Sequence, residues 1–375
     1  MGPLHGIKVV EVASIGPGPF AAMMLADMGA DVIRLERTDG SGGAGLGSGS
    51  WNVMHRNRPS VACDLKTEAG VAMVKRLVAD ADAVIEGFRP GVMERLGLGP
   101  DVLTGINPRL VFGRMTGYGQ DGPMSAVAGH DINYIAVAGA LGAMQRQGEK
   151  PLFPLNLVGD FGGGGMFLAF GVVCAILEAR GSGKGQVVDA AMVDGTAVLM
   201  TMVHAFRALG IWSDTPGTNL LDSGAHFYEV YETSDAGHLA IGAIEPQFYA
   251  ELLRLMDLDP AEFPQMDMKR WPELKQRFAA VFRTKTRDEW VEILESAETC
   301  ATGIYGVVEA KEHPHNVARG TFIEVDGRLQ PAPAPRFSRT SPGTPLPTPV
   351  PGADTESALA AWGLDAAEIA ALTAS

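Results

Sequence analysis

The chain has 375 residues, of which 46% are hydrophobic and 20% are charged, a balance typical of a soluble globular protein with a large core. Its formal net charge of -14 argues against nucleic acid or an anionic membrane surface as a partner, because both require a basic footprint. The three cysteines, Cys63, Cys174 and Cys300, form no CxxC pair, so we expect neither a disulfide framework nor a cysteine metal site, and we expect a reducing, cytoplasmic setting.

Strand and helix patterns alternate over the first third of the chain. Strand patterns cover 7–13, 31–37, 60–65, 82–88 and 109–119, and helix patterns cover 19–30, 68–81 and 90–98. The first strand begins without a signal-peptide pattern. Such alternation is typical of a parallel sheet with right-handed crossovers, so we expect a doubly wound, Rossmann-like α/β domain.

The middle of the chain has a different character. Residues 39–50, DGSGGAGLGSGS, form a Gly/Ser tract that is either a plain surface loop or a lid near a ligand. Residues 129–212 are mostly helical and apolar. Within them, the apolar run 165–177 is too short to span a bilayer, so we expect a buried helix and no membrane partner.

A second domain is indicated after residue 222. The segment 225–244 contains two strand patterns around SDAGH, which is typical of a hairpin, and helical patterns follow it. A Pro-rich stretch at 330–352 precedes short C-terminal helices. We therefore expect a large domain at 1–200, a linker at 201–224, a small α+β domain at 225–330, and a return at 331–375 that completes the large domain.

The turn GPGPFA at 16–21 fits a loose dinucleotide-binding fingerprint, and Glu36 lies where a ribose-binding acid would follow. Against this interpretation, Pro17 and Pro19 stiffen the turn, and Pro19 lacks an amide that could meet a phosphate. A plain tight turn from strand to helix is therefore the favoured interpretation of the pattern. The HPH sequence at 313–315 is typical of a surface turn, so no metal site is predicted.

Two stretches place polar groups at the start of apolar helices: His130 and Asp131 in GHDINYIAVAGA, and Asp160 in LVGDFGGGG. Each could be a helix cap or a satisfied core group. If they converge on one ligand carbon, however, they can act as two proton-transfer groups. Removal of a proton next to a carbonyl gives an enolate, whose oxygen could be stabilised by backbone amides at glycines 162–165. One base on each face of the carbon would produce racemisation or epimerisation.

A series of motifs runs in order along nearly the whole chain. They are GIKVVEVASIGPGPFAAMMLADMGADVIRLER, DLK, EGFRPGVMERLGLGP, GRMTGYGQDGP, AGHDINYIAVAGAL, LNLVGDFGGGGMFL, GKGQVVDAAMVDG, AIEPQFYAEL and PAPRFSRT. Together they resemble the family III CoA-transferase superfamily, most closely its alpha-methylacyl-CoA racemase branch. This resemblance displaces the nicotinamide interpretation of the GPGPFA turn.

The resemblance implies an architecture and a set of site residues. It implies an interlocked homodimer with no cofactor, CoA bound on the large domain, and an active site shared with the small domain of the other chain. It implies that His130 and Asp160 are the two catalytic bases and that Glu245 pairs with the histidine. The acyl-CoA positions that it implies are Arg37, Cys63, Asp64, Leu65, Lys66, Gly129, Asp131, Ile132, Asn133 and Tyr134. Arg89 joins Arg37 and Lys66 as a chemically suitable phosphate contact.

Three functions remain open from the sequence. The first is a cofactor-independent racemase that inverts the 2-methyl centre of branched acyl-CoA thioesters. The second is a CoA-transferase, in which Asp131 would be the nucleophile that forms an acyl anhydride. The third is an acyl-CoA-binding protein without turnover, which the joint presence of His130, Asp160 and Glu245 disfavours.

Overall fold

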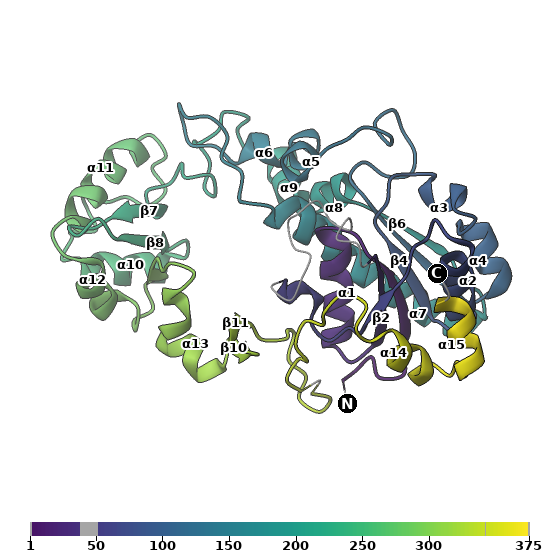
Figure 1. The fold of residues 1–375 in the computed structure, drawn as a ribbon. Helices are drawn as coiled ribbons and strands as arrows, with labels where there is room; N and C mark the ends of the chain where they lie inside the picture. Colours follow the sequence, from purple (N-terminus) through teal and green to yellow (C-terminus); the bar gives the residue numbers. More distant parts are fainter. Residues whose placement is uncertain (1, 38–51, 342, 374–375) are drawn as a thin grey trace. The chain divides into compact units, whose positions relative to one another are not determined.

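The computed structural model describes residues 2–37, 52–341 and 343–373, and the Gly/Ser tract at 39–50 lies outside them. The chain divides into two compact units (Figure 1). The first comprises Met1–Ala138, Pro154–Met200 and Arg319–Ser375, and the second comprises Gly139–Phe153 and Thr201–Ala318. The second unit therefore takes helices α6 (Ala140–Ala143) and α9 (Thr201–Ala208) from stretches that the sequence pattern assigned to the large domain and to the linker.

The first unit is built on a six-stranded parallel sheet. Its strands are β1 (Lys8–Val12), β2 (Asp31–Glu36), β3 (Ser60–Ala62), β4 (Ala83–Glu86), β5 (Val111–Thr116) and β6 (Val187–Ala191). Their spatial order is β3-β2-β1-β4-β5-β6, and every neighbouring pair is parallel. This order confirms the predicted doubly wound α/β fold. Strand β6 was not predicted, because its sequence lies in a region whose pattern is otherwise helical.

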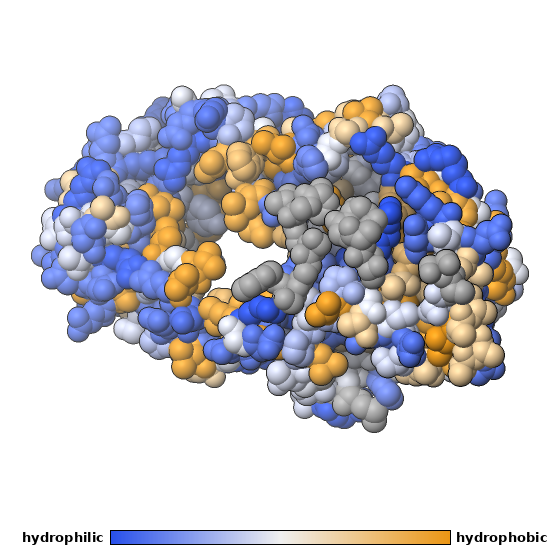
Figure 2. All heavy atoms as spheres, viewed as in Figure 1, coloured by the Kyte–Doolittle hydropathy of each residue, from blue (hydrophilic) through white to orange (hydrophobic). Residues whose placement is uncertain are grey.

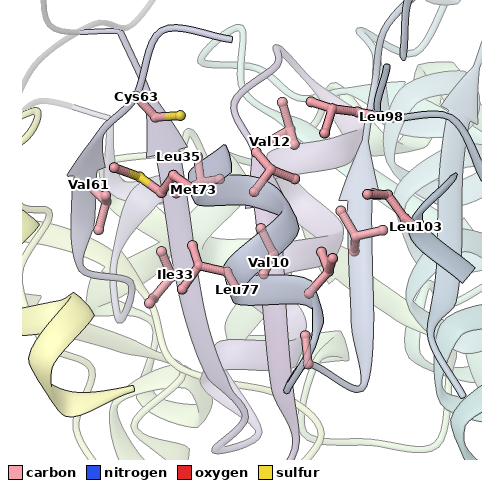
Figure 3. Packing of buried hydrophobic residues seen from close by; sticks show 14 of the residues in the cluster. Val10, Val12, Ile33, Leu35, Val61, Cys63, Met73, Leu77, Leu98 and Leu103 are labelled. Atoms are coloured by element: carbon pink, nitrogen blue, oxygen red, sulfur yellow. The ribbon is translucent and has the colours of Figure 1, made fainter. Parts of the chain in front are cut away.

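Alternate residues of each strand face opposite sides of the sheet, so every central strand supplies two cores. On one side, Val10 and Ile33 pack against Met73 and Leu77 of α2 (Glu68–Val78), as Figure 3 shows. Helices α3 (Val92–Arg95), α4 (Pro100–Ile106), α14 (Thr355–Ala361) and α15 (Ala366–Thr373) contribute to the same core or pack against it. The C-terminal segment thus completes this layer.

The opposite side of the sheet is covered by α1 (Pro17–Asp27) and α7 (Met166–Ser182), where Val9 packs with Leu25 and Val172. Helix α8 (Met192–Leu199) follows β6. Among the described residues, one helical stretch, Leu157–Ser182, is long and apolar enough to cross a membrane by length and composition alone. Since α7 lays one face on β5 and β6, as the core helix of a soluble protein does, this finding is weak evidence for a span.

The second unit has an antiparallel sheet of β7 (Tyr228–Glu232), β8 (His238–Gly242) and β9 (Ala301–Gly303), in that order. The predicted hairpin around SDAGH is therefore present as β7 and β8. Helices α10 (Pro246–Leu255), α11 (Trp271–Phe282) and α12 (Arg287–Leu294) enclose an aromatic core with this sheet. Phe278 lies near its centre, with ring contacts to Tyr249, Phe263 and Phe282.

The remaining elements are short. They are the 3-10 turns Val53–His55 and Glu309–Glu312, helix α5 (Asp131–Val137), the π-helix Leu157–Gly165, helix α13 (Pro314–Arg319), and the hairpin of β10 (Phe322–Val325) and β11 (Arg328–Pro331). Of these, α5 begins one residue after His130, and the π-helix contains Asp160, two of the catalytic residues that the sequence predicts.

Candidate active site

The predicted ligand-binding segments of the first unit lie at the carboxyl ends of its strands. Arg37 directly follows β2, Cys63 directly follows β3, and Arg89 comes three residues after β4. Because all six strands are parallel, their carboxyl ends form one edge of the sheet. The strand order reverses between β1 and β4, and open α/β sheets bind ligands at such a switch point.

His130 is the residue immediately before α5 and has an extended backbone, with φ -133° and ψ 176°. Its backbone N–H donates to Asn133 Oδ1 at 3.0 Å, so the asparagine caps the turn from which the imidazole projects. The side chain of His130 is exposed. His130 therefore lies at the boundary of a helix, which is the position that the capping interpretation predicts. Its imidazole is open to a ligand.

Asp131 joins this turn to the π-helix. Its carboxylate is buried, and Oδ2 accepts a hydrogen bond from the backbone N–H of Asp160 at 2.7 Å. The contact requires a glycine at position 159, since an added Cβ there would lie 2.5 Å from the same oxygen. The structure therefore brings His130, Asp131 and Asp160 together in one cluster, although they come from two separate stretches of the sequence.

The carboxyl group of Asp160 is half-buried at the switch point of the sheet. Asn156 Nδ2 donates to Asp160 Oδ2 at 3.0 Å, and an added Cβ on Gly16, in the turn after β1, would lie 3.4 Å from that oxygen. Burial raises the pKa of Asp160, and the charge of Asp131 adds to this rise, while the Asn156 hydrogen bond and the charge of His130 lower it. Asp160 and His130 therefore share one electrostatic environment.

Tyr134 supports the turn that carries His130. It is buried, its hydroxyl donates to the carbonyl oxygen of Gly129, and its ring contacts Tyr118 edge-on at 4.9 Å. Burial raises the pKa of Tyr134 to about 12, the charge of Asp160 adds to this rise, and the charge of Arg89 opposes it. Within the predicted segment 129–134, the exposed side chains are therefore those of His130, Ile132 and Asn133.

The glycine run after Asp160 packs against protein. Added Cβ atoms at Gly163 and Gly164 would lie 2.7 Å from Thr196 Oγ1 and 2.8 Å from Met192 Cγ, both on α8. One at Gly165 would lie 2.6 Å from the ring of Phe20 on α1. The expectation that this run offers backbone amides to a ligand is not supported for these three buried positions. Their glycines instead let the π-helix fit between α1 and α8.

The predicted segment Cys63 to Lys66 is divided between core and surface. The thiol of Cys63 is buried beside Met73 (Figure 3), and burial raises its pKa to about 12, so this side chain is not available to a ligand. The carboxylate of Asp64 accepts from the Lys66 amide at 3.0 Å and shapes the turn into α2. Leu65 and Lys66 line a pocket of about 380 Å³.

That pocket contains two further basic side chains, Lys75 of α2 and Arg95 of α3. Neither was predicted from the sequence. A signal for Lys75 exists, because Val71 and Lys75 are one helical turn apart and both line the pocket. No comparable spacing links Arg95 to Lys66, since only the packing of α3 beside α2 joins them. The pocket concentrates positive charge on an acidic protein, although Glu68 also lines it.

The alternative nucleotide interpretation of the GPGPFA turn finds no support. Glu36 is held by protein groups: Ser60 Oγ donates to it at 2.6 Å, and Arg34 Nε lies 3.4 Å away. The glycine at position 18 is explained by packing, since an added Cβ would lie 2.6 Å from Ser14 Oγ. Among the described residues, no group of three or more His, Cys, Asp or Glu side chains is placed to hold a metal ion.

A comparison with protein families matches residues 4–355 to CoA-transferase family III. The chain belongs to this family. Two relatives are alpha-methylacyl-CoA racemases: the mouse protein is 47% identical over 90% of this chain and 87% of its own length, and the human protein is 42% identical over 98% and 95%. A CaiB/BaiF family crystal structure from Brucella suis covers 96% of this chain and 99% of its own, with a TM-score of 0.82 at 25% identity.

In this family III chain, Glu245 lies in the second unit. It is the residue before α10, is exposed, and has an extended backbone with φ -71° and ψ 139°. Its charge contributes, after burial, to a raised pKa of Cys300. The pairing of Glu245 with the histidine of another subunit stays a prediction.

Proposed function

We propose that the protein is a racemase of 2-methylacyl-CoA thioesters, which inverts the 2-carbon by proton exchange through an enolate. The observation that carries this proposal is the hydrogen bond from the Asp160 amide to buried Asp131, the neighbour of His130. It ties the backbone of Asp160 to the residue next to His130, so an imidazole and a carboxyl group, two different proton-transfer groups, lie on adjoining segments. The racemase names of two relatives with high identity support the same reaction.

In the proposed reaction, one of the two groups takes the 2-proton and the C–H electrons pass into the enolate. The other group gives a proton to the opposite face, and the electron pair forms the new C–H bond. A raised pKa of Asp160 favours the protonated form that this second step needs. The thioester makes the 2-proton acidic, so the protein's task is to position two proton-transfer groups around one carbon.

We infer that the CoA part of the substrate is held along the carboxyl ends of β2 to β4. The basic groups Lys66, Lys75 and Arg95 of the 380 Å³ pocket are suitable for phosphate oxygens. Arg37 and Arg89 are further basic groups, just after β2 and β4, and Arg89 is exposed. Contacts to CoA that are remote from the reacting carbon would fix the position of that carbon, so binding and proton transfer would use different residues.

We propose further that the protein works as a homodimer. Helix α7 leaves Phe170 and Leu177 at least 70% exposed on the face away from the sheet. In the second unit, apolar residues gather at the surface around α6 and α9 (Figure 2), and Met202 and Leu209 are exposed there. Exposed apolar area of this kind marks protein contacts, and a second copy of the chain is the partner that an interlocked family member would supply.

A CoA-transferase remains the second candidate, because the family is named for that reaction. In the transferase hypothesis, Asp131 attacks an acyl group. The burial of Asp131 and its hydrogen bond to the Asp160 amide count against this role, since a nucleophile must reach its substrate. The racemase interpretation does not require Asp131 to be exposed, because its proton-transfer groups are His130 and Asp160.

The test is proton NMR of a single-enantiomer 2-methylacyl-CoA with the purified protein in deuterated water, without any free acid. We expect loss of the 2-proton signal together with inversion. His130→Ala and Asp160→Asn should bind CoA normally but lose about 10²–10⁴-fold in turnover, the usual contribution of a proton-transfer group. Absence of exchange in the wild-type protein, followed by CoA transfer once a free carboxylic acid is added, would replace the racemase proposal by the transferase one.

A further inference from the structure

The segment that presents Glu245 leaves its sheet just before that residue. The last backbone contacts to the sheet are from the Gly242 N–H to the Cys300 carbonyl at 2.8 Å and, as the end of the ladder, from the Ala243 N–H to the Phe227 carbonyl at 3.0 Å. Beyond it, the carbonyl oxygens of Ala243 and Ile244 both accept hydrogen bonds from one side chain, the amide Nε2 of Gln265, at 3.0 and 2.8 Å. The side chain of Gln265 therefore holds the backbone at the point where the ladder of the sheet ends.

Gln265 is itself held in place. Its own carbonyl oxygen accepts from the indole Nε1 of Trp271 at 2.8 Å, and Trp271 is buried in the aromatic core. The Gln265 side chain is half-buried. Its amide thus links the turn at 243–244 to the rigid part of the second unit, because both its partners and its anchor are fixed by packing.

The two contacts fix the backbone on the N-terminal side of Glu245. The Ile244 carbonyl belongs to the peptide plane that ends at the Glu245 nitrogen, so the Gln265 bond sets that plane. On the other side, Pro246 restricts Glu245 to an extended conformation, as observed. The direction in which the Glu245 carboxylate leaves the chain is therefore set by Gln265 and Pro246 together.

We propose that Gln265 is a positioning residue for the reaction, which acts by holding Glu245 in the orientation needed to support the catalytic imidazole. The proposal rests on the proposed racemase function and on the predicted role of Glu245. Gln265 touches neither substrate nor the reacting atoms in this account. Its effect should therefore appear in turnover and should depend on the presence of the Glu245 carboxylate.

The experiment compares Gln265→Met with the wild-type full-length protein in the exchange assay. Methionine has a similar length but donates no hydrogen bond. We expect kcat to fall about 10- to 100-fold with KM within about twofold, because a misplacement of about 1 Å costs up to 10²-fold in rate. The matched control is Asn316→Leu, which removes another side-chain amide bond to a carbonyl of the second unit, from Asn316 Nδ2 to Ala310 at 2.8 Å. It should leave kcat unchanged.

A double variant separates positioning from loss of structure. In a Glu245→Gln background, Gln265→Met should lower kcat no further, because the group that it positions is already absent. A wild-type kcat for Gln265→Met, or a full additional loss in the double variant, would overturn the positioning role. If Gln265→Met does not fold, Gln265→Asn, which draws the amide back by one methylene, takes its place with the same expectations. Failure of the wild-type protein to exchange the 2-proton would instead refute the racemase proposal itself.

Discussion

The carboxylates of Asp131 and Asp160 differ in their surroundings, and the difference fits the different roles that we propose for them. Asp131 is buried, and its Oδ2 accepts a hydrogen bond from the backbone N–H of Asp160. This hydrogen bond links α5 to the π-helix. Asp160 is less buried and carries a raised pKa, which suits an acid that must also act as a base. Neighbouring carboxylates commonly separate their roles in this way when their environments differ.

Asp131→Asn tests this division directly. Asparagine keeps an acceptor for the Asp160 amide but removes a negative charge that raises the pKa of Asp160. We expect kcat within about tenfold of wild type, and the limb of the pH–rate profile that reports Asp160 should move to lower pH. The measurement is kcat for proton exchange as a function of pH.

The matched control is Asp82→Asn. Asp82 also accepts a backbone amide, that of Lys8 at 2.8 Å, but it comes just before β4 and so lies at the opposite edge of the sheet. Its variant should leave the pH profile in place. A loss of more than about 10³-fold in the Asp131 variant, together with CoA transfer by the wild type, would restore Asp131 as a nucleophile.

Gly159→Ala should disturb the cluster without changing any charge. The added Cβ would lie 2.5 Å from Asp131 Oδ2, so either the carboxylate or the π-helix has to move. We expect a loss of about 1–3 kcal/mol in the free energy of unfolding, as for other overpacked sites, and a fall in kcat. Denaturant unfolding and the exchange assay measure the two effects.

A second glycine of the same helical stretch serves as the control. Gly181 lies near the end of α7, and an added Cβ there meets nothing within 4 Å. Gly181→Ala should therefore leave activity unchanged and raise stability by about 0.5–1 kcal/mol, because alanine favours the helix. Equal stability losses in both variants would mean that the contact between Gly159 and Asp131 is not the cause.

At the scale of elements, the turn between β4 and α3 is held by an array of charges, in which Glu86 and Arg114 are buried and Glu94 is exposed. Arg114 of β5 donates to Glu86 of β4 at 2.9 Å and to Glu94 of α3 at 2.7 Å. Glu86 also accepts the amide of Phe88 at 2.7 Å. The array therefore ties together the strand end, the turn that carries Arg89, and α3 with the basic pocket.

The pKa of Glu86 is raised by burial from its ordinary value of 4.5 to about 7. Folded protein therefore holds this proton more tightly than unfolded protein between these pH values, so the contribution of Glu86 to stability falls as pH rises through that window. In Glu86→Gln this decline is absent. We expect the difference in unfolding free energy between pH 4.5 and pH 7.5 to change by an amount on the order of 1–3 kcal/mol.

Glu94→Gln should change the pH dependence of stability in the opposite direction from Glu86→Gln. The hydrogen bond from Arg114 lowers the pKa of Glu94, so its contribution to stability is lost as pH falls. Unfolding of Glu86→Gln between pH 4.5 and pH 7.5, and of Glu94→Gln from pH 7.5 to below pH 4.5, measures the two directions. The same direction of change in both would contradict the separate environments of the two glutamates.

The elements that could be predicted are those whose signal is local. The alternation of apolar strands and helices up to Thr116 predicted five of the six strands of the sheet, because each of these strands carries a local pattern. The π-helix at 157–165 could not be predicted, since its glycines are required by α1 and α8, which approach only in the folded chain. Arg95 was missed for the same reason, and Lys75 was missed although its helical spacing from Val71 is a local signal. His130 and Asp160 are predicted from their motifs, and their catalytic roles stay a prediction.

At the scale of the whole molecule, the proposed residues come from two units. His130 and Asp160 belong to the first unit, and Glu245 belongs to the second. If the active site is shared between subunits, a chain that lacks His130 of the first unit and a chain that lacks Glu245 of the second unit should each be inactive alone. Within a mixed dimer, however, one of the two sites would combine the intact His130 of one chain with the intact Glu245 of the other.

Co-expression of His130→Ala and Glu245→Gln chains, each with its own affinity tag, tests this arrangement. We expect each variant alone to lose about 10²-fold or more in kcat, and the doubly purified mixed dimer to regain about half of the wild-type rate, because only one of its sites is complete. Mixed dimers of two His130→Ala chains with different tags should stay inactive. A mixed dimer no more active than its parents would place His130 and Glu245 of the same chain together, since then every site keeps one defect whichever subunits pair.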